Sequence, residues 1–305
     1  MDKIVNSFGN ALQTQWDWRA VGNFTFAGSG GALLLMIAVA YFQNVPAIPV
    51  SLTALVLVGL GLFCVWLEIG RPWRFLNVFF HPQTSWMTRE ASVAVLLFAV
   101  TLAGILLRLP LAFTAAGALG LLFLYCQGLI LRASKGIPVW REPAVVPLIV
   151  LTGLAEGAAL LLLLLIFTNQ QQPWLFYALP CLLLLRLFGW LRYRHKLAVG
   201  KTPVAAIRTL DGIHPLYLII GNLAPLLLLI CILPFPAFTK PFGLAAGVLA
   251  LFGGWLMKFT VVARAAHVQG YALGKLQKGR PQQIKPPVRR ERDRFVFDRQ
   301  YQGTE

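Results

Sequence analysis

The sequence predicts an all-α protein of the membrane class, a polytopic helix bundle with about eight transmembrane helices. Apolar residues make up 58% of the chain, charged residues only 12%, and the mean hydropathy is +0.70. An ordinary soluble domain is about a quarter charged. Runs of about 20 apolar residues, the length that crosses the hydrocarbon core, also recur along the whole chain. Finally, the basic residues gather between alternate runs, as in a multi-pass membrane protein.

Each apolar run is expected to be a helix, because backbone amides in lipid must be hydrogen-bonded within their own segment. The alternation with period two that is typical of a membrane barrel is not evident. Only Arg108-Leu109-Pro110 separates the third run from the fourth, so these two form a tight antiparallel hairpin. The predicted spans are 20–42, 47–68, 90–107, 111–131, 144–168, 174–191, 215–233 and 242–262.

The positive charge predicts the orientation. Of the 27 Lys and Arg residues, only Arg108 and Lys240 fall on one side of this arrangement, and all the others fall on the opposite side or at its helix ends. The positive-inside rule therefore predicts cytoplasmic termini in a bacterial inner membrane. The net charge of +16 then reflects topology and does not indicate binding to nucleic acid. The first 19 residues lack the features of a cleavable signal peptide, so none is expected.

The chain divides into an eight-helix membrane domain, residues 1–272, and a basic cytoplasmic tail, residues 273–305. The tail has too few apolar residues to fold alone. It is either a solvated segment along anionic headgroups, where each basic residue gains about 1 kcal/mol, or a docking arm for a cytoplasmic partner. Phe295, Phe297 and Tyr301 would give such an arm apolar surface to bury.

Cysteine and histidine positions argue against metal and haem in this chain. The cysteines occur singly inside apolar runs without Cys-x-x-Cys spacing, so they are expected to be packing residues and no iron–sulfur cluster is expected. The histidines all lie near the predicted cytoplasmic boundary, whereas a haem ladder needs pairs of axial ligands across the bilayer. No haem is therefore expected. These residues are Cys64, Cys126, Cys181 and Cys231, and His81, His195, His214 and His267.

Residues 67–90 hold the densest set of polar and aromatic side chains. Aromatic rings can stack on a quinone head group, while carboxyl and basic groups bond its oxygens and move protons. The alternative is an ordinary interfacial belt, with Trp and Arg at headgroup level and Glu90 placed to suit a helix dipole. The candidate quinone-binding residues are Glu68, Arg71, Arg74, His81, Trp86 and Glu90.

A second cytoplasmic loop, residues 132–143, repeats the Arg and Trp content. Two such loops on one face make a platform for a protein partner, although an interfacial loop has the same composition. The candidate partner-docking residues are Arg89, Arg132, Trp140 and Arg141.

Few polar residues lie deep in the spans, where ionisable groups are costly and are functional candidates. Glu156, near the middle of the fifth span, belongs either to a proton path or to a structural hydrogen bond between helices. Asn222 is expected to hold helices together, and Arg186 to extend its side chain towards the cytoplasm.

Four segments carry a family resemblance: residues 68–77 (EIGRPWRFLN), 85–90 (SWMTRE), 132–140 and 264–271 (RAAHVQGY). Their order resembles the membrane-anchor subunits of molybdopterin oxidoreductases, the polysulfide-reductase and DMSO-reductase anchor family (NrfD/DmsC-like). The resemblance covers the helical part of the chain and is most specific at 67–90.

The resemblance implies a haem-free, quinone-reactive subunit of eight helices that uses ubiquinone or menaquinone. It also implies a four-cluster iron–sulfur partner that in turn binds the molybdopterin catalytic subunit. Glu90 corresponds to the acid of the family's quinone site. Glu68 stands where a His is common, which leaves its proton-handling role open. His267 and Tyr271, in the last matching segment, join Glu156 as a possible proton path.

Because the matching loops fall on the positive side, the catalytic subunits are predicted to be cytoplasmic. The chain then looks most similar to the anchors of cytoplasmic sulfite dehydrogenases, in which sulfite oxidation to sulfate feeds the quinone pool. An anchor for phenylacetyl-CoA oxidation is the nearest rival, followed by polysulfide, DMSO and tetrathionate types. From other classes, a secondary transporter would show paired inverted halves, and a lipid-modifying enzyme an interfacial His or Asp cluster. Neither pattern is evident in the sequence.

Overall fold

The computed structural model describes residues 10–43, 45–69, 72–170, 172–200 and 202–268, so the predicted basic tail lies outside the described residues. Within these ranges, eight helical spans are long and apolar enough to cross a membrane, which confirms the all-α membrane bundle. They are Trp18–Ala40, Ala47–Glu68, Trp86–Leu107, Pro110–Ala133, Val145–Phe167, Leu175–Val199, Val204–Cys231 and Pro236–Arg264.

Several spans contain more than one helical element. The first contains α2 (Trp18–Gly22), the π-helix η1 (Asn23–Ala27) and α3 (Gly28–Ala40). The next ones are α4 (Ala47–Glu68), α5 (Trp86–Leu107), α6 (Pro110–Ala133), α8 (Val145–Phe167) and α9 (Leu175–Val199). The seventh contains α10 (Val204–Leu218), the π-helix η4 (Ile219–Leu223) and α11 (Ala224–Cys231). The last contains η5 (Pro236–Phe238), α12 (Thr239–Phe259) and the π-helix η6 (Thr260–Arg264).

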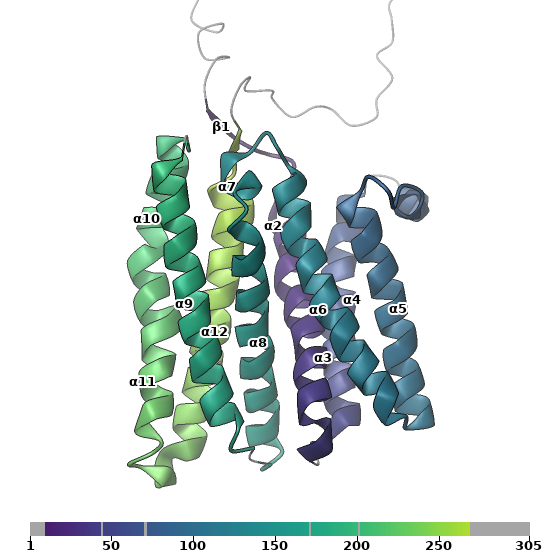
Figure 1. The fold of residues 1–305 in the computed structure, drawn as a ribbon, viewed down its shortest axis with the longest axis vertical. Coiled ribbons are helices and arrows are strands. Elements are labelled where there is room, and N and C mark those ends of the chain that lie inside the picture. Colours follow the sequence, from purple (N-terminus) through teal and green to yellow (C-terminus); the bar gives the residue numbers. More distant parts are fainter. Residues whose placement is uncertain (1–9, 44, 70–71, 171, 201, 269–305) are drawn as a thin grey trace, which may run out of the picture. The chain divides into compact units, whose positions relative to one another are not determined.

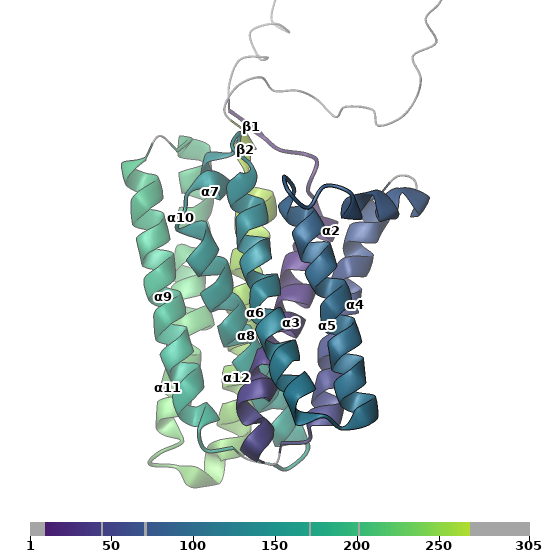
Figure 2. The same ribbon diagram turned by 45° about the vertical axis from the view of Figure 1, so that its right-hand side comes forward.

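Short elements connect these spans. They are the 3-10 helices η2 (Tyr41–Gln43) and η3 (Pro72–Phe79), the single turn α7 (Pro138–Arg141), and the strands β1 (Ala11–Leu12) and β2 (His267–Val268). Figure 2 shows η3 lying across the ends of α4 and α5 instead of running along them.

The helices α3 and α8 form the centre of the bundle. α3 packs against α4, α6 and α8, and α8 also packs against α9 and α12 (Figures 1 and 2). Residues 28–32 are all small, which allows neighbouring helices to approach α3 closely. Because successive spans run in opposite directions, the loops alternate between two ends. We call the end that carries residues 10–17, η3, α7 and β2 the terminal end, and the other the distal end.

The hairpin between α5 and α6 lies at the distal end, as predicted. Arg108 follows α5 in the left-handed conformation, with φ 52°, and Pro110 occupies the first turn of α6. A left-handed residue ends a helix, while proline suits a helix start because its missing N–H has no helical partner there. The two signals together explain a turn of so few residues.

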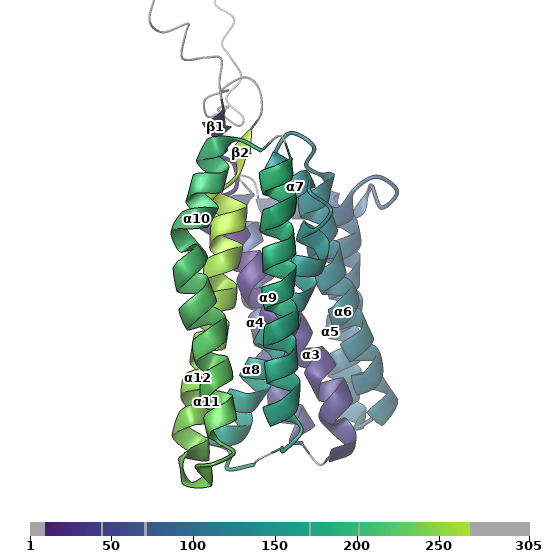
Figure 3. The same ribbon diagram turned by 60° about the vertical axis from the view of Figure 1, so that its left-hand side comes forward.

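Two helix boundaries differ from the sequence-based prediction more than the others do. α9 continues to Val199 instead of ending near residue 191, and α10 starts at Val204 instead of residue 215. Hydropathy detects only the lipid-facing length, whereas these extensions carry charged residues. An ion pair between Arg194 and Asp211 links them, and Figure 3 shows α9 and α10 side by side in this region.

The strands β1 and β2, which were not predicted, join the two ends of the described chain. Ala11 pairs with Val268 and Leu12 with His267 in antiparallel register, and Gln13 N donates to Ala266 O at 2.9 Å. This short ribbon fixes the segment that precedes α2 at the terminal end of the bundle.

Candidate functional site

A cavity of about 630 Å³ lies near the terminal end, between the first span, α4, η3 and α5. Among the described residues, its walls are almost entirely apolar, apart from two carboxyl groups and one amide. The lining residues are Trp16, Ala20, Asn23, Phe24, Gly59, Leu62, Phe63, Val65, Trp66, Glu68, Ile69, Phe75, Val78, Phe79, Met87, Glu90, Ala91, Ala94, Val95, Phe98 and Ile130.

The start of α5 places Glu90 in this cavity. Ser85 is the N-cap residue, and its Oγ accepts a hydrogen bond from Thr88 N at 3.3 Å. Such a cap fixes the first turn of the helix. Glu90 then falls one turn further on, on the face of α5 that packs inward, and is only 7% exposed.

An amide pair supports the Glu90 carboxyl. Asn23 Nδ2 donates to Glu90 Oε1 at 3.0 Å, and Gln127 Nε2 of α6 donates to Asn23 O at 3.0 Å. Within the described residues, the side-chain oxygens of Asn23 and Gln127 are buried without a hydrogen-bond partner. Buried polar atoms are normally paired with protein, water or ligand. The cavity therefore combines a buried acid with an unsatisfied acceptor on the lining residue Asn23.

Aromatic rings form much of the cavity wall. Phe63 and Trp66 of α4 stack on each other with ring centroids 5.7 Å apart, and Phe75 and Phe79 of η3 cover the same region. Phe63 and Val95 are 51% and 56% exposed, so the cavity reaches the outer surface of the bundle between α4 and α5. In a membrane this surface faces lipid. An apolar ring compound could thus enter the cavity without leaving the bilayer.

The structure brings together part of the predicted quinone-site set. Glu68 and Glu90 both line the cavity. Trp86 does not line it: the Arg89 guanidinium lies 4.0 Å from its ring centroid, and its ring meets Tyr125 edge to face. Arg74 and His81 are exposed and are likewise not lining residues. Arg71 lies outside the described residues.

The predicted docking residues occupy different environments. Arg132, in the last turn of α6, and Arg141, the last residue of α7, are both exposed. Arg89 donates to Pro82 O and Gln83 O at 2.8 and 2.9 Å and so holds the loop before α5. Trp140 is only 3% exposed, and its Nε1 donates to Val261 O at 2.8 Å. Its side chain is therefore part of the core and not of a docking surface, because the single turn α7 points it inward.

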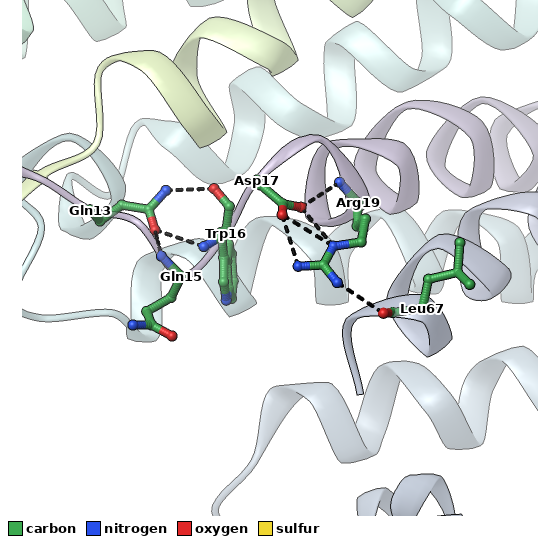
Figure 4. Close-up of polar contacts among 6 residues, drawn as sticks. All are labelled: Gln13, Gln15, Trp16, Asp17, Arg19 and Leu67. Carbon is green, nitrogen blue, oxygen red and sulfur yellow. Dashed lines mark hydrogen bonds and ion pairs between the residues drawn. The ribbon is translucent and has the colours of Figure 1, made fainter. Parts of the chain in front are cut away.

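The segment before α2, which was not among the candidates, supplies Trp16 to the cavity wall. Its ring lies 4.7 Å from that of Trp140. Figure 4 shows Gln13 folding back on this segment: its Oε1 accepts from Trp16 N at 2.8 Å and its Nε2 donates to Trp16 O at 2.7 Å. A Trp beside a membrane span is usually an interfacial anchor, so no sequence signal distinguished Trp16 from Trp18.

A polar contact ties this segment to the end of α4 (Figure 4). Asp17 caps α2 by accepting from Arg19 N at 2.9 Å, and the Arg19 side chain pairs with Asp17 while donating to Leu67 O at 2.9 Å. Hydrogen bonds from the Arg19 side chain lower the pKa of Asp17 below its ordinary value, against the smaller, opposing effect of partial burial.

A second polar cluster lies deeper in the bundle. Lys258 Nζ of α12 lies 2.6 Å from Glu156 Oε2 of α8, and both side chains are fully buried. Ser29 Oγ donates to the same oxygen at 2.7 Å, and Trp255 Nε1 donates to Ser29 Oγ at 3.2 Å. The sequence singled out Glu156 but placed Lys258 at the cytoplasmic boundary, so the ion pair was missed.

The other members of the predicted proton path are elsewhere. His267 belongs to β2 at the terminal end, where its Nδ1 lies 3.4 Å from Ala265 O. Tyr271 lies outside the described residues. The Glu156 carboxyl is instead hydrogen-bonded to Ser29 and Lys258.

Arg186 is fully buried in α9, and the prediction that it extends towards the cytoplasm is wrong. Its guanidinium donates to Asn222 Oδ1 at 3.0 Å, to Ala250 O at 2.8 Å and to Gly221 O. Pro225 has no N–H, so Gly221 O lacks the helical donor four residues along. The guanidinium takes that donor's place, and three acceptors on two neighbouring spans hold the charge inside the bundle.

A family model described as DMSO reductase anchor subunit (DmsC) matches residues 20–235. No curated protein matches the chain. The matched segment contains Asn23, Glu90, Gln127 and Glu156, and it ends before Lys258.

Proposed function

The chain belongs to the DMSO reductase anchor subunit (DmsC) family, and from this premise we propose that it is the quinone-reactive membrane anchor of a molybdopterin oxidoreductase. It would pass electrons between an iron–sulfur subunit and the quinone pool. The family assignment and the eight candidate membrane spans support a multi-pass anchor. The quinone site itself is our proposal.

The buried carboxyl of Glu90 in an aromatic cavity is the observation that carries this proposal. A quinone supplies two-electron, two-proton chemistry when it is bound. Phe75, Phe79 and Trp66 offer faces against which its ring can pack. Asn23 holds the Glu90 carboxyl through Oε1, and Glu90 gives or takes a proton at a quinone oxygen. The unpaired Asn23 Oδ1 can accept a bond from a quinol hydroxyl.

The carboxyl groups of Glu68 and Glu90 have different roles in the proposed proton transfer. Glu68 lies at the end of α4 and is partly exposed, whereas Glu90 is buried. Glu68 can therefore exchange protons with the water at the terminal end, and Glu90 with the ring. This division supports proton transfer from one end of the cavity to the other.

We place the iron–sulfur subunit and the molybdopterin catalytic subunit at the terminal end, on the cytoplasmic side of a bacterial inner membrane. The exposed basic loops support this, because Arg132 and Arg141 lie at that end whereas Lys240 lies at the distal end. Such positive loops are retained in the cytoplasm. A cytoplasmic complex fits oxidation of sulfite to sulfate with reduction of quinone; phenylacetyl-CoA, polysulfide, DMSO and tetrathionate complexes are the alternatives.

Kinetics of the purified complex test this proposal. Glu90→Gln retains the hydrogen bond with Asn23 but removes the proton-carrying group, so quinone turnover should fall by about 100-fold while reduction of an artificial dye by the catalytic subunit is unchanged. The exposed Arg192 of α9 gives a matched control, because Arg192→Gln should leave both activities unchanged. Normal quinone turnover in Glu90→Gln would contradict the assignment.

A further inference from the structure

Four charged side chains are buried among the described residues: Glu90, Glu156, Arg186 and Lys258. Two are acidic and two basic, so the set is neutral when all four are ionised. Isolated buried charges are costly, and the field between them is weakly screened. Any proton that one member gains therefore favours the loss of a proton by another.

Hydrogen bonds lead from Glu90 in the cavity towards the buried Glu156–Lys258 pair. Glu90 bonds Asn23 Nδ2, and Asn23 O accepts from Gln127 Nε2. Asn23 and Gln127 each keep one buried oxygen without a partner among the described residues. Two unsatisfied acceptors in one region are sites that an internal water normally fills.

Gly28 marks the connection between Gln127 and the ion pair. A Cβ atom at Gly28 would lie 2.7 Å from Gln127 Oε1 and 3.0 Å from Lys258 Nζ. Both atoms therefore border the same small space beside α3, and a single water can bridge them. Lys258 has three N–H donors, and its hydrogen bond to Glu156 uses one of them.

The far end of this path has a hydrogen-bond acceptor that is not satisfied by the described residues. Glu156 Oε2 accepts from Lys258 and Ser29, whereas Glu156 Oε1 is buried without a partner among the described residues. Gly254 leaves room for this oxygen, because a Cβ atom there would overlap it. The carboxyl can thus rearrange its bonds when the charge on Lys258 changes.

We propose that the Glu156–Lys258 pair is an internal proton store that serves the cavity, along a path lined by Asn23 and Gln127. The proposal rests on the proposed quinone site. In quinone reduction the iron–sulfur partner supplies two electrons. Glu90 gives one proton to a quinone oxygen, and water at the terminal end supplies the second proton through Glu68. The Lys258 ammonium then gives its proton, through waters at the two amide oxygens, to the Glu90 carboxylate. Lys258 is left as a neutral amine and Glu90 as an acid, and quinol oxidation runs the transfer in reverse.

Infrared difference spectra of the intact complex, recorded between oxidised and reduced quinone, test this store. We expect a change in carboxyl absorption that disappears in Glu156→Gln, because the carboxyl bonds differ between charged and neutral Lys258. Gln127→Leu interrupts the path and should abolish the Glu156 signal, retain the Glu90 signal and slow quinone turnover about tenfold. A Glu156 signal that is absent in the wild type, or unchanged in Gln127→Leu, would overturn the proposal.

Two controls separate the possible failures. Thr101→Val removes a buried hydroxyl that donates to Leu97 O of the same helix, α5, and should leave the spectra and turnover unchanged. If Glu156→Gln alone fails to assemble, the double variant Glu156→Gln/Lys258→Met removes both charges together and should also lack the signal. Failure of the quinone site itself would appear differently, as normal turnover in Glu90→Gln.

Discussion

Gly254 shows how much a single methyl group would change in the deep polar cluster. A Cβ atom on Gly254 would overlap Glu156 Oε1 and push the carboxyl away from Lys258. Gly254→Ala should therefore lower the free energy of unfolding by about 1–3 kcal/mol. Gly212→Ala is the matched control, since a Cβ there would meet no described atom within 4 Å. It should stabilise α10 by roughly 0.5–1 kcal/mol. Thermal unfolding in detergent would measure both shifts, and equal melting temperatures would contradict this packing.

Asp17 contributes to stability in a pH-dependent way. Because its pKa is lowered in the folded state, its stabilisation is present above the ordinary Asp pKa of 3.8 and is lost as the pH falls through the lowered value. Asp17→Ala should cost about 1 kcal/mol near neutral pH through loss of the α2 cap, and Asp17→Asn less, because Asn still caps. Melting temperatures across pH would check this. A loss that persists unchanged at the acidic end would contradict it.

Individual site residues were predictable from the sequence where an ionisable side chain also lies at a helix end among aromatic residues. Glu90 and Glu68 stood out as carboxyl groups at helix ends among aromatics, and the structure places both in one cavity. Lys258 was assigned to the surface because a basic residue near the end of a span usually reaches the interface. Only the packing of α12 against α8 reveals its partner, and no local pattern encodes that contact.

Among the helices, α9 depends on the geometry of one side chain. The Arg186 guanidinium donates from separate nitrogens to acceptors on the seventh and eighth spans at once. A Lys cannot do this, because all its donors lie on one nitrogen. Arg186→Lys should leave buried acceptors unpaired and lower the free energy of unfolding by about 3 kcal/mol. Arg192→Lys, exposed on the same helix, should change it by less than about 0.5 kcal/mol. Unfolding curves of equal midpoint for the two variants would refute this role.

The helices themselves were predictable to different extents. The apolar runs located all eight spans, and Arg108-Leu109-Pro110 gave the hairpin correctly. The π-helices η1 and η4 were not predicted. They depend on side chains meeting backbone from other helices, as where Gln127 bonds Asn23 O and Arg186 bonds Gly221 O.

For the whole molecule, orientation in the membrane is a separate prediction. In a variant whose native cysteines are replaced, a cysteine at Lys240 of the distal end should react with an impermeant maleimide from the periplasmic side of intact cells. A cysteine at Lys135 of the terminal end should react only after permeabilisation, because that end carries the positive loops. The reverse labelling pattern would place the proposed partner subunits outside the cytoplasm.

A structure of the assembled complex with a quinone analogue bound would test the quinone site most directly. We expect analogue density in the cavity between α4, η3 and α5, with one ring oxygen within hydrogen-bonding distance of Glu90 and the ring against Phe75 or Phe79. Glu90→Gln should reduce quinone turnover without removing this density. Analogue density at another site, such as the distal pocket beside Arg108 and Tyr41, with the cavity holding only lipid, would contradict it.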